Sequence, residues 1–123
     1  MITPNKQLGT QGEELVVQFL ESKGYTILER NYAKQYGEID LIASKNDIIA
    51  FIEVKTRKQD YFDLEEVILP SKQRKIIAVA KAYLARQKKI IDAIGRFDVA
   101  LVHGSGSHAR INYLENAFGE EQW

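Results

Sequence analysis

Hydrophobic residues follow two different spacings along the chain, and each spacing predicts a different kind of element. Within residues 12–23, apolar side chains return at helical intervals, and Gly24 is a natural end for that helix. A short strand is expected at 25–29. Residues 37–44 and 48–55 are dense in Ile, Val and Phe, which is typical of strands. A helix, a strand and a β-hairpin are therefore predicted for the first half of the chain.

The second half continues with a helix and two strands. Ser71 is the predicted N-cap of this helix, and residues 97–102 and 109–114 have the composition of strands. The predicted order is α-β-β-β-α-β-β, which belongs to the α/β or α+β class, with helices packed against a mixed sheet. One domain is expected over residues 1–118, followed by a loose C-terminal tail at 119–123.

Composition narrows the chemistry that this fold can carry. The chain has no cysteine, so disulfides, thiolate nucleophiles and thiolate metal sites are excluded. The net charge is zero, but residues 54–96 hold 11 basic and 5 acidic residues, so positive charge is concentrated in the middle of the chain. No apolar run has the length of a signal-peptide core or a membrane span, and a cytoplasmic protein is expected.

The predicted hairpin carries four charged residues at its open end. A two-residue turn at 46–47 sets Asp40 directly opposite Glu53. The next pair on the same face is Glu38 and Lys55. Because side chains alternate along a strand, these four residues share one face of the hairpin. The other face is predicted to carry apolar residues, namely Ile39, Leu41, Ala50, Ile52 and Val54.

Two carboxylates on directly opposed residues lie ~5 Å apart at Cβ and repel each other. Three arrangements relieve this repulsion. One carboxylate can take a raised pKa and hold a proton, or Lys55 and other basic groups can form a structural ion network with the acids. Alternatively, a hard divalent cation lies between the acids, as Mg²⁺ does with one or two carboxylates, water and phosphate oxygens. The hairpin alone leaves all three open.

Asp40, followed after 12 residues by Glu53, Val54 and Lys55, resembles the D…ExK signature of the PD-(D/E)xK nuclease superfamily. Further segments, in the same order, resemble the bacterial YraN-type family, which is itself similar to archaeal Holliday-junction resolvases. The resemblance spans about residues 8–118. The matching segments are 12–15, 24–25, 29–31, 37–42, 51–57, Lys72, 96–99 and 116–118.

This resemblance implies a restriction-endonuclease-like fold and a metal-dependent endonuclease that hydrolyses phosphodiester bonds in DNA, with branched or structured DNA as a plausible preference. It implies that Asp40 and Glu53 bind Mg²⁺ or Mn²⁺. Lys55 would orient the attacking water or stabilise developing negative charge. Glu13 resembles the helical glutamate that completes the acidic cluster of the resolvases, which implies a catalytic role in which it holds a second metal or a metal-bound water. Glu38 would support the site by orienting Lys55.

Five basic residues are candidates for contact with DNA. Lys72 and Arg74 lie at the start of the second predicted helix, where cations oppose the helix dipole, and this favours a phosphate-facing role. Arg57 and Lys58 follow the ExK strand and either contact the DNA backbone or lie in a solvated loop. Arg30 either contacts substrate or pairs with an acid. Because the resolvases act as homodimers, the resemblance also allows a homodimer.

Two other functions stay open from the residues alone. The first is a non-catalytic nucleic-acid-binding module that keeps the nuclease fold. The second is a structural or protein-interaction domain in which the charged end of the hairpin is a salt-bridge network. Outside the hairpin, Asp98 alternates with apolar residues, so a buried partnership with Arg96 or a backbone N–H is favoured over a metal role.

Overall fold

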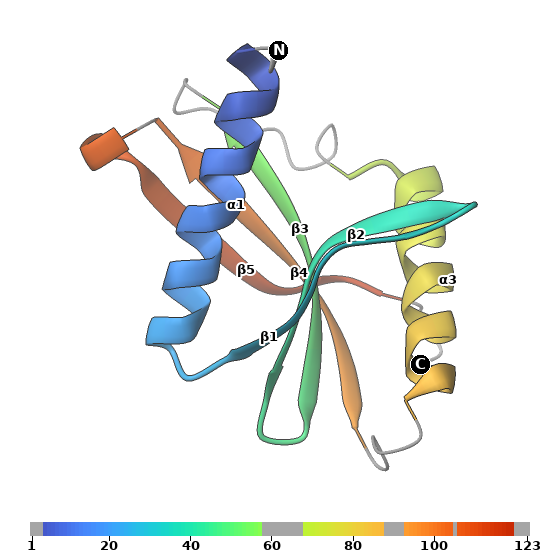
Figure 1. Ribbon diagram of the computed structural model, residues 1–123. Helices are drawn as coiled ribbons and strands as arrows, with labels where there is room; N and C mark the ends of the chain where they lie inside the picture. Colours follow the sequence, from blue (N-terminus) through green and yellow to red (C-terminus); the bar gives the residue numbers. More distant parts are fainter. Residues whose placement is uncertain (1–3, 58–67, 88–92, 105, 120–123) are drawn as a thin grey trace.

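The fold is a mixed sheet with a helix on each of its two faces (Figure 1). The computed structural model describes residues 4–57, 68–87, 93–104 and 106–119. The elements are α1 (Pro4–Ser22), β1 (Thr26–Lys34), β2 (Gly37–Lys45), β3 (Ile48–Arg57), α3 (Pro70–Arg86), β4 (Ile94–His103), the 3-10 turn η1 (Gly106–His108) and β5 (Arg110–Phe118). None of the described helices is long and apolar enough to cross a membrane.

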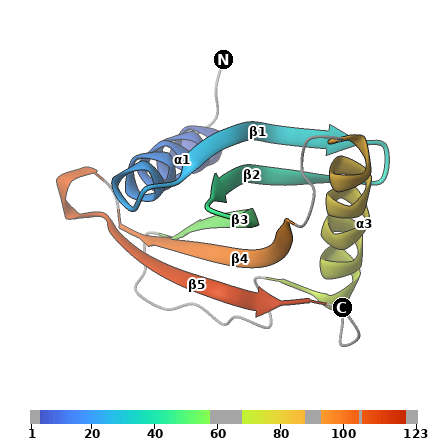
Figure 2. The same cartoon turned by 90° about the horizontal axis from the view of Figure 1, so that it is seen from below.

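The five strands lie in the sheet in the same order as in the chain, as Figure 2 shows. β3 and β4 run parallel, and every other pair of neighbours runs antiparallel. The parallel pair requires a crossover, and α3 lies in that connection. The predicted order α-β-β-β-α-β-β and the predicted mixed sheet are confirmed.

The two ends of α1 follow different local signals. The helix ends as predicted, because Gly24 has a left-handed φ of 93° and the N–H of Tyr25 donates to the carbonyl of Leu20. Its start lies at Pro4, well before the predicted start at residue 12. Proline is well suited to the first helical position, where no intrahelical N–H bond is needed.

The predicted N-cap of α3 was wrong. Leu69 occupies the N-cap position, without a side-chain hydrogen bond, and Pro70 follows as the first helical residue. Ser71 therefore lies inside the first turn. The fixed φ of proline is preorganised for the helix, and this outweighs the capping preference of a serine placed one residue later.

Each face of the sheet has its own hydrophobic core. On one face, α1 packs on alternate residues of the central strands, and on the other face α3 does so. The first core includes Val16, Leu20, Leu41, Ala43, Ala50, Ile52, Ala100 and Val102. The second core includes Ile39, Ile42, Phe51, Ile76, Val79, Ala80, Tyr83, Phe97 and Val99.

The register of the β2–β3 hairpin is confirmed near the turn and ends one pair before the predicted acid pair. Asn46 has a left-handed φ of 56° in the turn, and the ladder continues to the partners Leu41 and Ile52. At the next residue, Oδ2 of Asp40 accepts a hydrogen bond from the backbone N–H of Val54 at 2.8 Å. A carboxylate thus takes the place of a ladder carbonyl, and the two strands separate from here on.

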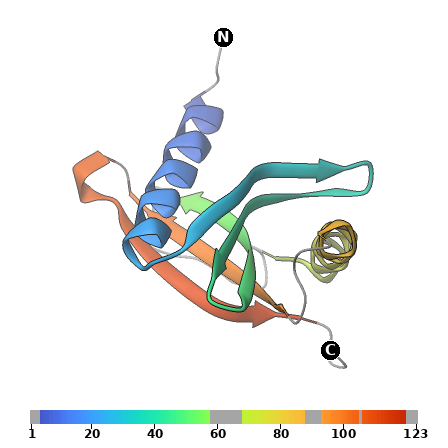
Figure 3. The same cartoon turned by 60° about the horizontal axis from the view of Figure 1, so that its bottom comes forward.

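The β1–β2 hairpin bends at the same point and extends toward α3, as Figure 3 shows. Asn31, which the register places opposite Asp40, has a left-handed φ of 52° within β1. Because of the bend, Ile39 lies in the core with α3, whereas Leu41 packs against α1. The prediction that these two residues share one face was therefore wrong, since it assumed a straight strand.

Close packing of α1 on β3 depends on Gly12. A Cβ at this position would lie 2.1 Å from Oγ1 and 3.4 Å from Cβ of Thr56. One of the two other χ1 rotamers of the β-branched Thr56 brings its methyl group toward the helix instead, so few rearrangements relieve the contact without a shift of α1. We expect Gly12→Ala to lower the free energy of unfolding by about 1–2 kcal/mol in urea, even though alanine favours helix interiors by about 1 kcal/mol.

The variant Gly12→Ala/Thr56→Ala provides the matched control, because it removes the obstructing hydroxyl and methyl groups. It should recover most of the stability lost in Gly12→Ala. A single Gly12→Ala variant as stable as the wild type would contradict the close contact between α1 and β3.

Candidate metal centre

Asp40 and Glu53 face a common pocket at the point where β2 separates from β3. This acid-pair pocket has a volume of about 340 Å³ and lies beneath the first turn of α3. The side chain of Glu53 is 5% exposed, so its carboxylate has little contact with bulk water. The lining residues are Gly37, Glu38, Asp40, Glu53, Ser71, Lys72, Lys75 and Ile76.

The carboxylate of Asp40 lacks enough neighbouring positive charge. Burial and, after it, the charge of Glu53 raise the pKa of Asp40 from 3.8 to about 7, although the N–H of Val54 acts in the opposite direction. Lys72 also lowers this pKa, but its effect is smaller than those of burial and Glu53. At neutral pH the pocket therefore favours either a proton on Asp40 or an additional cation.

Lys72 already neutralises one of the two acids. Its Nζ lies 2.5 Å from Oε1 of Glu53, and the lysine side chain is 42% exposed. The sequence predicted Lys72 as a DNA contact, and the structure places its ammonium group at the acid pair. The partial exposure leaves a path by which this flexible side chain can turn toward solvent or a phosphate.

Glu13 approaches the acid pair from α1. Burial raises the pKa of Glu13, and the charges of Glu38 and Glu53 add to this effect, whereas Arg30 opposes it. The side-chain amide of Asn31 is oriented with its nitrogen toward two acids. This nitrogen donates to Oε1 of Glu13 at 3.3 Å and to Oε1 of Glu38 at 3.1 Å. One amide thus joins an acid from α1 to an acid from β2.

Asn31 was given no role from the sequence. Its left-handed backbone within a strand, opposite Asp40, is what distinguishes it. Backbone strain of this kind concentrates at functional sites. The asparagine itself could have indicated this irregular backbone. Asparagine is disfavoured in strands, and it tolerates a left-handed φ better than most residues do.

Lys55 follows Glu53 by two residues on β3 and is partly buried. β3 is regularly paired with β4 over its whole length, including the partners Lys55 and Leu101, so the alternation of side chains is not interrupted. Lys55 therefore projects from the same face of the sheet as Glu53. This is the arrangement predicted for the ExK strand.

The donor set suits a hard divalent cation. Asp40 and Glu53 offer carboxylate oxygens, and Mg²⁺ is commonly bound by one or two carboxylates together with water and phosphate oxygens. Across the described ranges, no three His, Cys, Asp or Glu side chains form a group that could hold a metal. Asp40 and Glu53 would therefore be the direct ligands, and Glu13 would act electrostatically from a greater distance.

The other predicted DNA contacts lie on separate elements. On β1, Nη1 of Arg30 forms an exposed ion pair with Oε2 of Glu14 at 2.9 Å. Arg57 is exposed at the end of β3, and Arg74 is exposed in the first turn of α3. Lys58 lies outside the described residues. Arg57 and Arg74 thus lie on elements, β3 and α3, that also line the acid-pair pocket.

Asp98 belongs to a separate buried network, as predicted. It is fully buried, and both its oxygens accept hydrogen bonds from Arg96. The hydroxyl of Tyr113 donates to Oδ2 at 2.6 Å, and the N–H of Asn116 donates to Oδ1 at 2.9 Å. Arg96 also donates to the hydroxyl of Tyr25. With its charge balanced and its oxygens occupied, Asp98 has no role in the acid pair.

Comparison with known proteins agrees on one family. The model of the uncharacterised protein family UPF0102 matches residues 12–102. A UPF0102 protein of Clostridium perfringens is 47% identical, over 93% of this chain and 95% of its own length. One of Alkaliphilus metalliredigens is 45% identical, over 93% of this chain and 99% of its own, and one of Vibrio parahaemolyticus is 40% identical, over 94% of each. The chain belongs to the UPF0102 family.

Proposed function

We propose that this protein is a metal-dependent endonuclease that hydrolyses phosphodiester bonds in DNA. The observation that carries the proposal is the acid-pair pocket, in which two carboxylates from adjacent strands face each other and Asp40 lacks a full counter-charge. Paired buried acids of this kind are costly in a purely structural role. A divalent cation removes that cost and provides the chemistry for phosphate ester hydrolysis.

Each residue of the site has a defined task in this proposal. Asp40 and Glu53 hold the ion, which when bound supplies Lewis-acid polarisation of the scissile phosphate. Lys55 orients the attacking water and stabilises the charge that develops on the phosphate. Glu13 adds negative potential from α1. Lys72, which now pairs with Glu53, would contact a phosphate oxygen of the substrate.

The proposed substrate is DNA, with branched or structured DNA preferred. The acid-pair pocket lies beneath the first turn of α3, where Arg74 and Lys75 are exposed. Their positive charge compensates for the acids below and favours the approach of a phosphate backbone. The resemblance to Holliday-junction resolvases supports a homodimer acting on a branched substrate, and this assembly is part of the proposal.

The test is cleavage of labelled branched, single-stranded and duplex DNA in the presence of Mn²⁺ or Mg²⁺. We expect cleavage by the wild type and its loss to background in both Asp40→Ala and Lys55→Ala. Asp47→Ala and Lys45→Ala are matched controls, because they remove the same charges at the closed end of the same hairpin. Cleavage that persists in both site variants would mean that another nuclease contaminates the preparation.

The ion pair between Lys72 and Glu53 favours one alternative function. It is the type of contact expected if the charged end of the hairpin is a structural network in an interaction domain. Calorimetric titration with Mn²⁺ distinguishes the two functions. A metal centre requires binding by the wild type that Glu53→Ala abolishes, whereas absence of binding by the wild type, even with DNA present, would support the structural network.

A further inference from the structure

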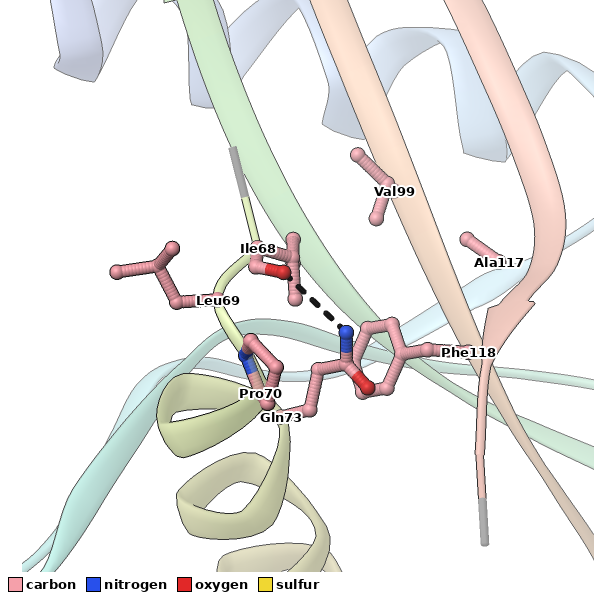
Figure 4. Close-up of a pocket in the computed structure, with 7 residues that line it drawn as sticks. All are labelled: Ile68, Leu69, Pro70, Gln73, Val99, Ala117 and Phe118. Carbon is pink, nitrogen blue, oxygen red and sulfur yellow. Dashed lines mark hydrogen bonds between the residues drawn. The ribbon is translucent and has the colours of Figure 1, made fainter. Parts of the chain in front are cut away.

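A second, more apolar pocket lies beside the acid-pair pocket, between the start of α3 and the end of β5 (Figure 4). Its volume is about 520 Å³, within the range of about 300–1,000 Å³ that is typical of small-molecule sites. Most of its wall is apolar, and the carboxamide of Gln73 is its one polar side chain among the described residues. This α3–β5 pocket is lined by Ile68, Leu69, Pro70, Gln73, Val99, Ala117 and Phe118.

A bulge in β5 forms one wall of the α3–β5 pocket. The β4–β5 register shifts between the partners of Phe97 and Val99, and Asn116 has a left-handed φ of 53° there. The N–H of Asn116 donates to the fully buried Asp98, which fixes the bulge. Phe118 then stacks on Phe97, with ring centroids 5.1 Å apart, so its ring is held in one orientation.

The α3–β5 pocket and the acid-pair pocket are immediate neighbours. Val99, at the base of the apolar pocket, is the ladder partner of Glu53, and adjacent strands lie about 4.8 Å apart. On the helix, Lys72 contacts Glu53 and the next residue, Gln73, lines the apolar pocket. The first turn of α3 thus separates the acid-pair pocket from the α3–β5 pocket.

We propose that the α3–β5 pocket receives one unpaired nucleobase of the DNA strand whose phosphate lies at the acid pair. This inference rests on the proposed nuclease function and specifies its substrate. In a nucleotide, a charged phosphate and a flat, largely apolar base are close neighbours, and the two pockets offer these two environments side by side.

The chemistry of the lining matches the faces and the edge of a base. Apolar side chains and the Phe118 ring contact the faces, because every base has a π-face suited to such contacts. The carboxamide of Gln73 lies beside Phe118, with its Nε2 donating to the carbonyl of Ile68 at 3.2 Å (Figure 4). This fixes the amide so that its oxygen can accept from a base edge, as glutamine does in DNA recognition.

A base in a continuous duplex is stacked and cannot enter such a pocket. Unpairing and unstacking a base costs free energy, and this cost is smallest where the base is already unpaired. The pocket therefore selects DNA with an unpaired nucleotide next to the cleavage point, such as a branch, a bulge or a single strand. Leu69, 55% exposed at the pocket, would become covered by the bound nucleotide.

The test compares three DNAs of one sequence: a full duplex, a duplex with one unpaired adenine, and the same duplex with an abasic residue in place of that adenine. Binding is measured by fluorescence anisotropy in Ca²⁺, to limit cleavage. We expect the unpaired adenine to bind about tenfold more tightly than the abasic residue, because contact with a base face contributes that much. 2-Aminopurine at the unpaired position should also change its fluorescence on binding.

Ala117→Leu fills the α3–β5 pocket without removing any core side chain. It should abolish the preference for adenine over the abasic residue while leaving binding of the full duplex and of Mn²⁺ unchanged. Ala117→Ser is the matched control and should keep the preference. Gln73→Leu, on the helix side of the pocket, should weaken the preference for adenine over the abasic residue. It provides a second variant if Ala117→Leu does not fold.

The outcomes separate this inference from the nuclease proposal. Mn²⁺-dependent cleavage together with equal binding of the adenine and abasic DNAs would overturn the base pocket alone. A preference for adenine that survives in both Ala117→Leu and Gln73→Leu would also overturn it, because the base would then bind elsewhere. Failure of the wild type to bind any of the three DNAs would overturn both proposals.

Discussion

Asp40→Asn is expected to raise the free energy of unfolding of the metal-free protein by about 2–4 kcal/mol at pH 8. Burial and the charge of Glu53 raise the pKa of Asp40 from 3.8 to about 7, so above that pH the folded protein must hold an unfavourable carboxylate. Asparagine removes the charge and keeps an oxygen that can accept from the N–H of Val54. Neutralising an acid of the proposed metal centre should therefore stabilise the protein.

The dependence on pH fixes the sign of this effect. The folded state binds the Asp40 proton more tightly than the unfolded state, whose pKa is near 3.8. The stability that this proton contributes is fully present below about pH 4 and is lost as pH rises to about 7. The difference between Asp40→Asn and the wild type should therefore be close to zero at pH 4 and grow toward pH 8.

Urea denaturation at several pH values in the presence of a chelator measures this difference. Glu21→Gln, which neutralises an exposed acid at the end of α1, is the control and should change stability by less than about 0.5 kcal/mol at any pH. Added Mn²⁺ should stabilise the wild type and have little effect on Asp40→Asn. An Asp40→Asn variant that is less stable than the wild type at pH 8 would indicate a favourable ion network with Lys72.

The sequence was sufficient to predict the order of the elements and the proximity of the two acids, but not the end of their ladder at Leu41 and Ile52. Periodicity separates helix from strand, and an Asn-Asp turn sets the hairpin register, so Asp40 and Glu53 are placed together before any tertiary contact is known. Both predictions depend on residues that are close in the sequence. The same holds for the end of α1 at Gly24, where a single residue type determines the local backbone.

The features that the sequence did not predict arise from contacts between distant segments. The bend in β2 depends on a hydrogen bond from Val54 to Asp40 and on the left-handed backbone of Asn31, one strand away. The position of Lys72 beside Glu53 depends on where α3 docks. One wall of the α3–β5 pocket is a bulge in β5 that is anchored to a buried acid on β4. No periodic pattern carries this information.

Asp98→Ala is expected to lower the free energy of unfolding by about 3–5 kcal/mol, because it leaves a mostly buried cation without its partner. The side chain of Arg96 is 14% exposed, and its other partners are the hydroxyl of Tyr25 and, at 3.9 Å, the carboxylate of the exposed Glu115. Burial, together with the charge of Asp98 and a hydrogen bond to it, raises the pKa of Tyr113, which therefore stays protonated as a donor. Removing the acid leaves this hydroxyl and the N–H of Asn116 without their acceptor.

A double-mutant cycle with Arg96→Met assigns this loss to the pair. Each single variant leaves one buried charge unpaired, whereas Asp98→Ala/Arg96→Met leaves neither, so the double variant should be at least about 1 kcal/mol more stable than the sum of the two losses predicts. Tyr113→Phe removes one donor to the carboxylate and should cost less, about 1.5–3 kcal/mol. Additive losses would mean that Arg96 and Asp98 act independently.

Asp98 also anchors the bulge at Asn116, so Asp98→Ala should weaken the preference for an unpaired base. Mn²⁺ should still bind at the acid pair, because Asp98 is not part of that pocket. This variant would therefore show that ligand binding at one pocket can be lost without loss at the other.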